Sequence, residues 1–151
     1  MPNDLGPEKL RELLETTVPF VRRAGLKALE LAPGRVKLLM PFAGNENHIG
    51  IMYAGALFTL AEVPGGALFL TTFDIEKYYP VVKEINIRFR RPATGDVTIE
   101  VAMAQDEIGR INAEVEAGGK SEFILEGQIT DGQGQVAAIA RGVYQIRKHG
   151  S

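Results

Sequence analysis

"NHIGIMYAGALFTLAEVPGGALFL", residues Asn47–Leu70, decides the fold, because from Ile49 onward it is the most apolar run in the chain. Its interior holds a single charged residue, Glu62, together with Pro64 and several glycines. These interruptions, and the lack of a basic anchor before the run, argue against a membrane-spanning helix. The stretch instead predicts a buried helix that is apolar on nearly every face. A domain accommodates such a helix only by surrounding it with other elements.

The composition is that of one globular domain covering residues 1–151. The chain is 45% hydrophobic and 24% charged, which places it in the ordinary globular class, and its length is enough to bury a sizeable core. A formal net charge of −2 supplies no basic field for nucleic acid. The chain has no cysteine and two histidines, which excludes Cys-ligated and His-rich metal sites. Its first residues lack the pattern of a secretory signal, so we expect a cytoplasmic protein.

The rest of the sequence predicts the elements that surround the buried helix. Apolar residues at helical spacing predict an N-terminal amphipathic helix within residues 6–25, kinked at Pro19. A polar helix is expected within residues 106–119, where two glycines close it. Alternating apolar and polar residues, separated by turn residues, predict six strands, within residues 26–32, 35–42, 81–91, 97–104, 121–130 and 135–147.

Six strands that follow one another as hairpins predict an antiparallel sheet, with turns at Pro33–Gly34, at residues 92–96 and at residues 131–134. A helix that is apolar all round requires a sheet that wraps it on one side and a cover on the other. We therefore expect an α+β fold, a curved antiparallel sheet of about six strands around a long central helix, with the N-terminal helix beside it.

The segment Asn45–Glu62, NENHIGIMYAGALFTLAE, resembles the site segment of hotdog-fold acyl-CoA thioesterases of the phenylacetic-acid-pathway type and their uncharacterised relatives. In those proteins an Asn, a helix start made of small residues and an LFxLAD or LFxLAE carboxylate occur in this order. The order of strands and buried helix agrees over most of the chain. The resemblance implies a hotdog fold and hydrolysis of an acyl-CoA or related acyl thioester, with coenzyme A as part of the substrate and no further cofactor.

Glu62 lies on a stripe of small or polar residues along the predicted helix. Gly55, Thr59, Glu62 and Gly66 recur at steps of four, three and four, which places them on one face. The apolar surroundings should raise the pKa of Glu62. Its carboxylate could act as general base on a water or attack the thioester as a nucleophile. The alternative is a structural role, in which hydrogen bonds hold Glu62 in the core.

The start of the helix supplies the second part of the predicted site. If the helix begins near Tyr53, the N–H groups of Ala54 and Gly55 are unpaired at the positive end of the helix dipole and could bind an oxyanion. The family that this segment resembles usually carries His-Gly-Gly where this chain has Tyr53, Ala54 and Gly55. Tyr53 therefore does not match a histidine that could act as an acid at this position. Asn47 would orient the water or hold the carboxylate, unless it only forms a turn. His48, from the preceding loop, could replace the missing His or be structural.

Further residues are expected to contact the substrate. His48, Tyr53 and Thr59 would line the site. Arg88 and Arg90 alternate to one face of a strand while Arg91 lies at its end. Arginines bind phosphate, of which coenzyme A carries several, whereas a solvated outer strand face is the alternative. The expected partner is a small-molecule acyl thioester, not a nucleic acid or a membrane.

Two other functions fit the same fold. A non-catalytic module that binds acyl-CoA or a fatty acyl group would use Glu62 only as a wall residue. A hotdog dehydratase would need a His and a Pro-Gly pattern that this sequence lacks.

The expected sheet also predicts an oligomer. One curved antiparallel sheet leaves exposed edges, and hotdog proteins pair two such sheets, so the resemblance implies a homodimer or a homotetramer built as a dimer of dimers. The active site would then lie between subunits. Residues from the segment Phe73–Glu84 of one chain would meet Glu62 of the other.

Overall fold

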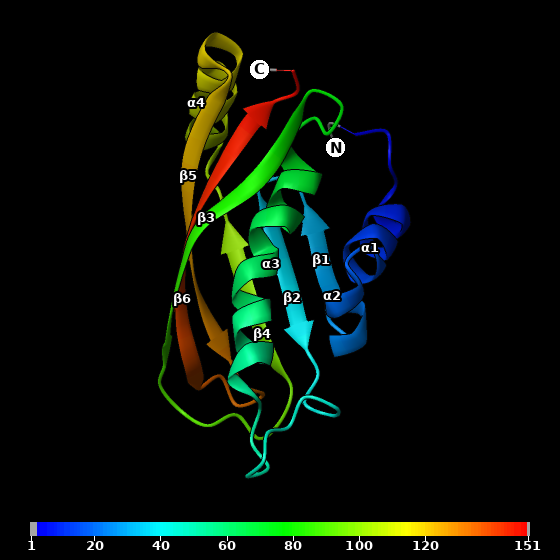
Figure 1. Ribbon diagram of the computed structural model, residues 1–151, viewed down its shortest axis with the longest axis vertical. Helices are drawn as coiled ribbons and strands as arrows, with labels where there is room; N and C mark the ends of the chain where they lie inside the picture. Colours follow the sequence, from blue (N-terminus) through cyan, green and yellow to red (C-terminus); the bar gives the residue numbers. More distant parts are fainter. Residues whose placement is uncertain (1–2, 151) are drawn as a thin grey trace.

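The computed structural model describes residues 3–150 and places one long helix against a curved sheet (Figure 1). The helices are α1 (Pro7–Thr16), α2 (Pro19–Ala24), α3 (Ala54–Thr72) and α4 (Gln105–Gly118). The strands are β1 (Lys27–Ala32), β2 (Arg35–Met40), β3 (Tyr78–Phe89), β4 (Val97–Ala102), β5 (Lys120–Thr130) and β6 (Val136–Lys148).

The six strands form one antiparallel sheet in the order β1-β2-β4-β5-β6-β3. Strands β1 and β2 form one hairpin and β5 and β6 form another. Their turns contain left-handed glycines, Gly34 at φ 78° and Gly134 at φ 80°, a conformation that other residues rarely adopt. The sheet curves around α3 (Figure 1). The α+β architecture expected from the sequence is therefore confirmed.

The expectation of a hairpin at residues 92–96 is wrong, because the strands on either side of this turn are not neighbours. β3 lies at one edge of the sheet beside β6, whereas β4 lies between β2 and β5. The connecting segment passes the loop that leads into α3, where the N–H of Met52 donates to the carbonyl oxygen of Ala93 over 2.8 Å. Alternation of apolar residues identifies strands but not their order, since the order depends on which edges pair.

The N-terminal segment forms two helices and not one kinked helix. Val18, between them, is extended at φ −93° and ψ 114°. The ring of a proline disfavours the helical conformation in the residue before it, so Pro19 ends one helix and begins the next. Gly25 closes α2 in the left-handed conformation at φ 81°. α1 contacts both β1 and α3, so this pair of helices covers part of the side of α3 that the sheet leaves open (Figure 1).

Helix α3 forms the centre of the core and stays helical through Pro64. Thirteen of its 19 residues are buried. Within residues 3–150 it is the one helix long and apolar enough to cross a membrane, and 67% of that apolar window is buried inside the domain. Burial to this extent is what the core helix of a globular domain requires.

A tyrosine from the sheet fills the space between α3 and β6. A Cβ on Gly65 of α3 would lie 2.0 Å from the ring of Tyr144, and a Cβ on Gly142 would lie 2.6 Å from it. The Tyr144 side chain is only 3% exposed, and its hydroxyl donates to the main-chain oxygen of Glu62 over 3.1 Å. The two glycines therefore make room for the ring that supports the middle of α3.

Candidate functional site

The start of α3 presents unpaired backbone donors. Tyr53 is the N-cap residue, and its carbonyl oxygen accepts the N–H groups of Ala56 and Leu57 over 3.0 and 3.2 Å. The N–H groups of Ala54 and Gly55 have no acceptor within residues 3–150. Both lie in the first turn, where the helix dipole favours negative charge. The helix therefore begins where the sequence predicts, with two free donors.

Asn47 shapes the loop before this helix. Its Oδ1 accepts hydrogen bonds from the N–H groups of Ile49, over 3.0 Å, and Ile51, over 3.2 Å. The carbonyl group of its side chain is therefore used in a turn. The Nδ2 group of Asn47 has no acceptor in the described part of the chain. Asn47 thus forms the turn through its Oδ1 and leaves both N–H donors of its Nδ2 group free within the described chain.

A pocket of about 320 Å³ adjoins the start of α3 and brings distant parts of the chain together. The segment that connects β3 to β4 forms the other wall of this pocket. It runs past the start of α3 because β3 and β4 are not neighbours in the sheet. The pocket is lined by Asn47, Ile51, Met52, Ala54, Leu57, Phe89, Arg90, Arg91, Pro92 and Ala93.

Two of the three predicted arginines reach this pocket. Arg90 and Arg91 line it, whereas Arg88 lies outside it on β3. All three are exposed, and none forms an ion pair with an acidic residue of the described chain. Arg91 donates from Nη1 to Oε1 of Gln135 over 2.8 Å. The structure thus brings two cations without acidic partners beside the free N–H group of Ala54.

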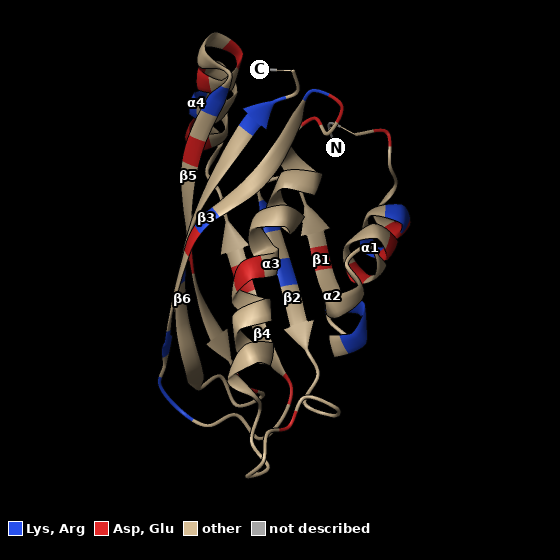
Figure 2. Ribbon diagram, viewed as in Figure 1, with Lys and Arg blue, Asp and Glu red and all other residues tan. Residues whose placement is uncertain are grey.

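Glu62 is the only charged residue of α3, and it is the one red patch on this helix in Figure 2. Its side chain is half-buried, and burial raises its pKa above the ordinary value of 4.5. Within residues 3–150 its carboxylate has no hydrogen bond and no ion pair. A structural carboxylate should be held by such bonds. The carboxylate of Glu62 is therefore free of partners in the described chain and accessible to a ligand or a water.

Glu62 opens onto an apolar groove of about 550 Å³ between α3 and the pair α1–α2. The start of β3 and the end of the chain complete its walls. The lining residues are Leu13, Leu14, Thr17, Val18, Val21, Glu62, Val63, Gly66, Phe69, Leu70, Ile75, Tyr78, Tyr79, Pro80 and His149. Residues of the segment Phe73–Glu84 thus share this groove with Glu62 of their own chain.

The structure divides the predicted site between two cavities with no lining residue in common. At a rise of 1.5 Å per residue, Gly55 and Glu62 lie about 10 Å apart along α3. Within one chain, Ala54 at the start of α3 and the carboxylate of Glu62 therefore face different cavities, each with one half of the predicted site.

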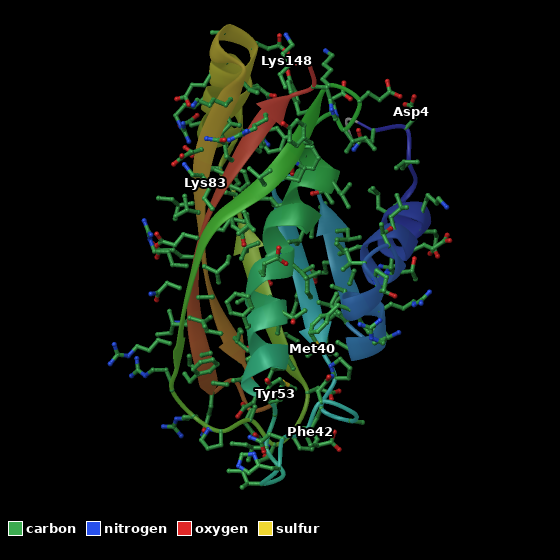
Figure 3. All side chains as sticks on the ribbon, in the orientation of Figure 1. Asp4, Met40, Phe42, Tyr53, Lys83 and Lys148 are labelled. Carbon is green, nitrogen blue, oxygen red and sulfur yellow. The ribbon has the colours of Figure 1, made fainter. Side chains whose placement is uncertain are left out.

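The remaining predicted residues lie apart from either cavity. His48 is exposed and lines neither. Tyr53 is 58% exposed and lies at the start of α3 (Figure 3). Its ring covers Gly55, because a Cβ on Gly55 would lie 2.5 Å from the ring. Thr59 is buried, and its hydroxyl donates to the carbonyl oxygen of Gly55 over 2.8 Å.

Sequence reasoning missed two residues that hold the site in place. Tyr144 supports the turn of α3 that carries Glu62, and only the glycines at Gly65 and Gly142 hint at it. Asn45 donates from Nδ2 to the carbonyl oxygens of Ala24 and Pro41, both over 2.8 Å, which ties the loop before α3 to the end of α2. Within residues 3–150 no group of three metal-binding side chains is found.

Comparison with known proteins places the chain among hotdog proteins. Residues 6–146 match the family described as "Domain of unknown function (DUF4442)". A crystal structure from Pseudomonas aeruginosa, of a protein of unknown function named "Probable Thioesterase", is 54% identical with a TM-score of 0.92. The alignment covers 96% of this chain and 97% of that one. No curated protein sequence matches the chain.

More distant structures share the fold alone. A protein of unknown function from Chlorobaculum tepidum has a TM-score of 0.81 at 20% identity, covering 94% of each chain. A thioesterase from Haemophilus influenzae has a TM-score of 0.76 at 15% identity, covering 99% of this chain and 96% of that one. With the six-stranded sheet around α3, these likenesses confirm the expected hotdog fold.

Proposed function

The chain belongs to the family described as "Domain of unknown function (DUF4442)", and we propose that it hydrolyses an acyl-CoA or related acyl thioester to the free acid and the thiol. The names of its structural relatives support a thioesterase-type function. The observation that carries the proposal is Glu62, a half-buried carboxylate that has no partner in the described chain and whose pKa is raised by burial. Such a carboxylate lowers stability, and proteins commonly retain a cost of this kind where the group serves the chemistry.

The reaction uses the two halves of the site for different tasks. Glu62 accepts a proton from a water molecule while the oxygen of that water bonds to the carbonyl carbon of the thioester. The N–H groups of Ala54 and Gly55 stabilise the oxyanion that results. Collapse of this intermediate breaks the carbon–sulfur bond, and the leaving thiolate takes the proton that Glu62 accepted, which restores the carboxylate. If Glu62 instead attacks as a nucleophile, it forms an anhydride that water then hydrolyses. Asn47 orients the water through its free Nδ2 group.

The separation of about 10 Å between Gly55 and Glu62 supports a site shared between two chains. The donors of one chain then meet Glu62 of its partner. The edge strand β3 is the surface proposed for this pairing, because it is 12 residues long and exposes Val82 and Phe89 by 47% and 50%. An exposed edge of this length pairs readily with a second strand.

Light scattering is expected to give at least twice the chain mass of 16.5 kDa at micromolar concentration. Replacing Val82 by Lys should reduce that mass, since a charged side chain on an edge strand opposes pairing with a second strand. The same change should reduce thioester turnover in parallel, because it separates the two halves of the site. Ile124→Lys is the matched control, because Ile124 is a similarly exposed apolar residue on β5, which lies inside the sheet. A fully active monomer would contradict the shared site.

The arginines of the first pocket are proposed to bind the coenzyme A phosphates. Replacing both Arg90 and Arg91 by Ala should raise KM for a coenzyme A thioester about tenfold, equivalent to about 1.4 kcal/mol. A truncated thioester without the nucleotide should be affected much less. Added salt should act in the same direction as the substitutions. The double variant of Arg22 and Arg23, two exposed arginines on α2, serves as the control. If the Arg90 and Arg91 variant had the same KM as wild type, phosphate binding would be contradicted and these arginines would belong to a solvated strand face.

A non-catalytic acyl-binding module remains the second candidate, supported by the size and apolar lining of the groove beside Glu62. Release of thiol from a panel of acyl thioesters separates the two functions. Turnover that increases in proportion to enzyme concentration supports the hydrolase. Saturable binding of acyl thioesters without thiol release would support the binding module.

A further inference from the structure

A glycine in the middle of α3 is unexplained by packing or by backbone conformation. Gly66 follows Gly65, but the two differ in their surroundings. A Cβ on Gly65 would strike Tyr144, whereas a Cβ on Gly66 would meet nothing within 4 Å. Gly66 is also helical, so no left-handed conformation requires it. A glycine inside a helix is destabilising relative to alanine. Because an alanine would fit at position 66, the presence of Gly66 needs another explanation.

That open space belongs to the apolar groove beside Glu62. Gly66 lies one turn along α3 from Glu62, and both line the groove together with Phe69 and Leu70. The opposite wall comes from α1 and α2, including Thr17 at the junction between them. Apolar side chains dominate the lining, and Glu62 is its only carboxylate. Pockets of this size and character bind the apolar part of a small molecule.

We propose that Gly66 is a specificity-determining residue that keeps this groove open for an extended aliphatic acyl chain. The inference rests on the proposed function, since it assigns the groove to the acyl group of the thioester attacked at Glu62. The acyl chain enters the groove at Glu62 and follows α3 past Gly66 toward Leu70. A side chain at Gly66 would narrow the groove one turn beyond the reacting carbon.

The groove sets an approximate length for the acyl group. From Glu62 to Leu70 the helix rises about 12 Å. An extended alkyl chain advances roughly 1.25 Å per carbon, given C–C bonds of about 1.5 Å. The groove therefore accommodates about eight to ten carbons, and an acyl group of four carbons would end near Gly66. Medium-length acyl thioesters are the expected substrates.

The test compares decanoyl-CoA with butyryl-CoA in wild type and in Gly66→Leu. We expect wild type to prefer decanoyl-CoA, and Gly66→Leu to lower the ratio of the two kcat/KM values by about tenfold or more. Thr17→Phe fills the groove from the opposite wall and should lower the same ratio, so it decides the matter if Gly66→Leu does not fold. Gly109→Leu is the matched control, because Gly109 lies inside α4, has open space around its Cβ position and lines no part of the groove.

Calorimetric titration with decanoate separates this inference from the proposed function. If wild type releases no thiol but binds decanoate, and both groove variants bind it at least tenfold more weakly, the groove is confirmed and the hydrolase proposal fails. If wild type hydrolyses thioesters but neither groove variant changes the chain-length ratio, the inference is wrong and the hydrolase stands. Loss of oligomer mass in Gly66→Leu with an unchanged ratio would show that a second copy of the chain fills the groove, which also overturns the inference.

Discussion

Glu62→Gln is expected to lower kcat for thioester hydrolysis by roughly 10²-fold or more while the protein stays folded. Glutamine keeps the shape of the side chain but cannot accept a proton from water or attack a carbonyl. In wild type, kcat/KM should rise with pH through the raised pKa of Glu62, above the ordinary value of 4.5, because the ionised carboxylate is the active form. This rise should be absent from any residual activity of the variant.

Stability should change in the opposite direction to activity. Because burial raises the pKa of Glu62, the folded state binds its proton more tightly than the unfolded state does, so ionisation of Glu62 destabilises the fold as pH rises through that pKa. Glutamine removes this effect. The Tm of the variant should therefore equal or exceed that of wild type at pH 7, and the difference should shrink as the pH falls toward 4.5.

Measurements of kcat and Tm on the same preparation distinguish catalysis from a structural role. Glu126→Gln is the control, since the Glu126 side chain is 73% exposed on β5. If kcat were unchanged in Glu62→Gln, the catalytic role of Glu62 would be contradicted, whatever the Tm of the variant. A destabilised variant whose folded fraction turns over normally would support the structural alternative.

Gly65→Ala is expected to destabilise the fold by about 2 kcal/mol or more. The new methyl group would lie 2.0 Å from the ring of Tyr144, which is 3% exposed and has Gly142 close on its other side. Overpacking a core of this density costs about 1–3 kcal/mol and occasionally more, beyond the gain of about 1 kcal/mol in helix propensity. For a domain of this size Tm should fall by roughly 4–8 °C.

The neighbouring glycine provides the matched control for this prediction. Gly66→Ala gains the same helix propensity without a clash, so its Tm should rise slightly. Combining Gly65→Ala with Tyr144→Leu should recover part of the lost stability, because the smaller side chain vacates the space the methyl group needs. If Gly65→Ala and Gly66→Ala were equally stable, the close packing of α3 on Tyr144 would be contradicted.

The parts of the candidate site that lie on α3 have local signals in the sequence. A carboxylate in an apolar run marks Glu62, and the small residues after Tyr53 mark a helix start with free donors. The sequence could not show that these two features lie in different cavities. That follows from the rise of α3 together with the walls that other elements build around each half. The position of Arg90 and Arg91 beside the first pocket likewise depended on a crossover that alternation of apolar residues does not encode.

The sequence by itself determined most elements of this protein, because their signals lie in residues close together along the chain. The apolar run predicted α3, alternation predicted six strands, and glycines such as Gly34 and Gly134 predicted the turns between them. Tertiary structure alone decided the order of the strands and the different roles of Gly65 and Gly66. The same residue type at adjacent positions in one helix faces Tyr144 in one case and an open groove in the other. Only contacts between segments distant in the chain create that difference, since intrinsic propensity is identical at both positions.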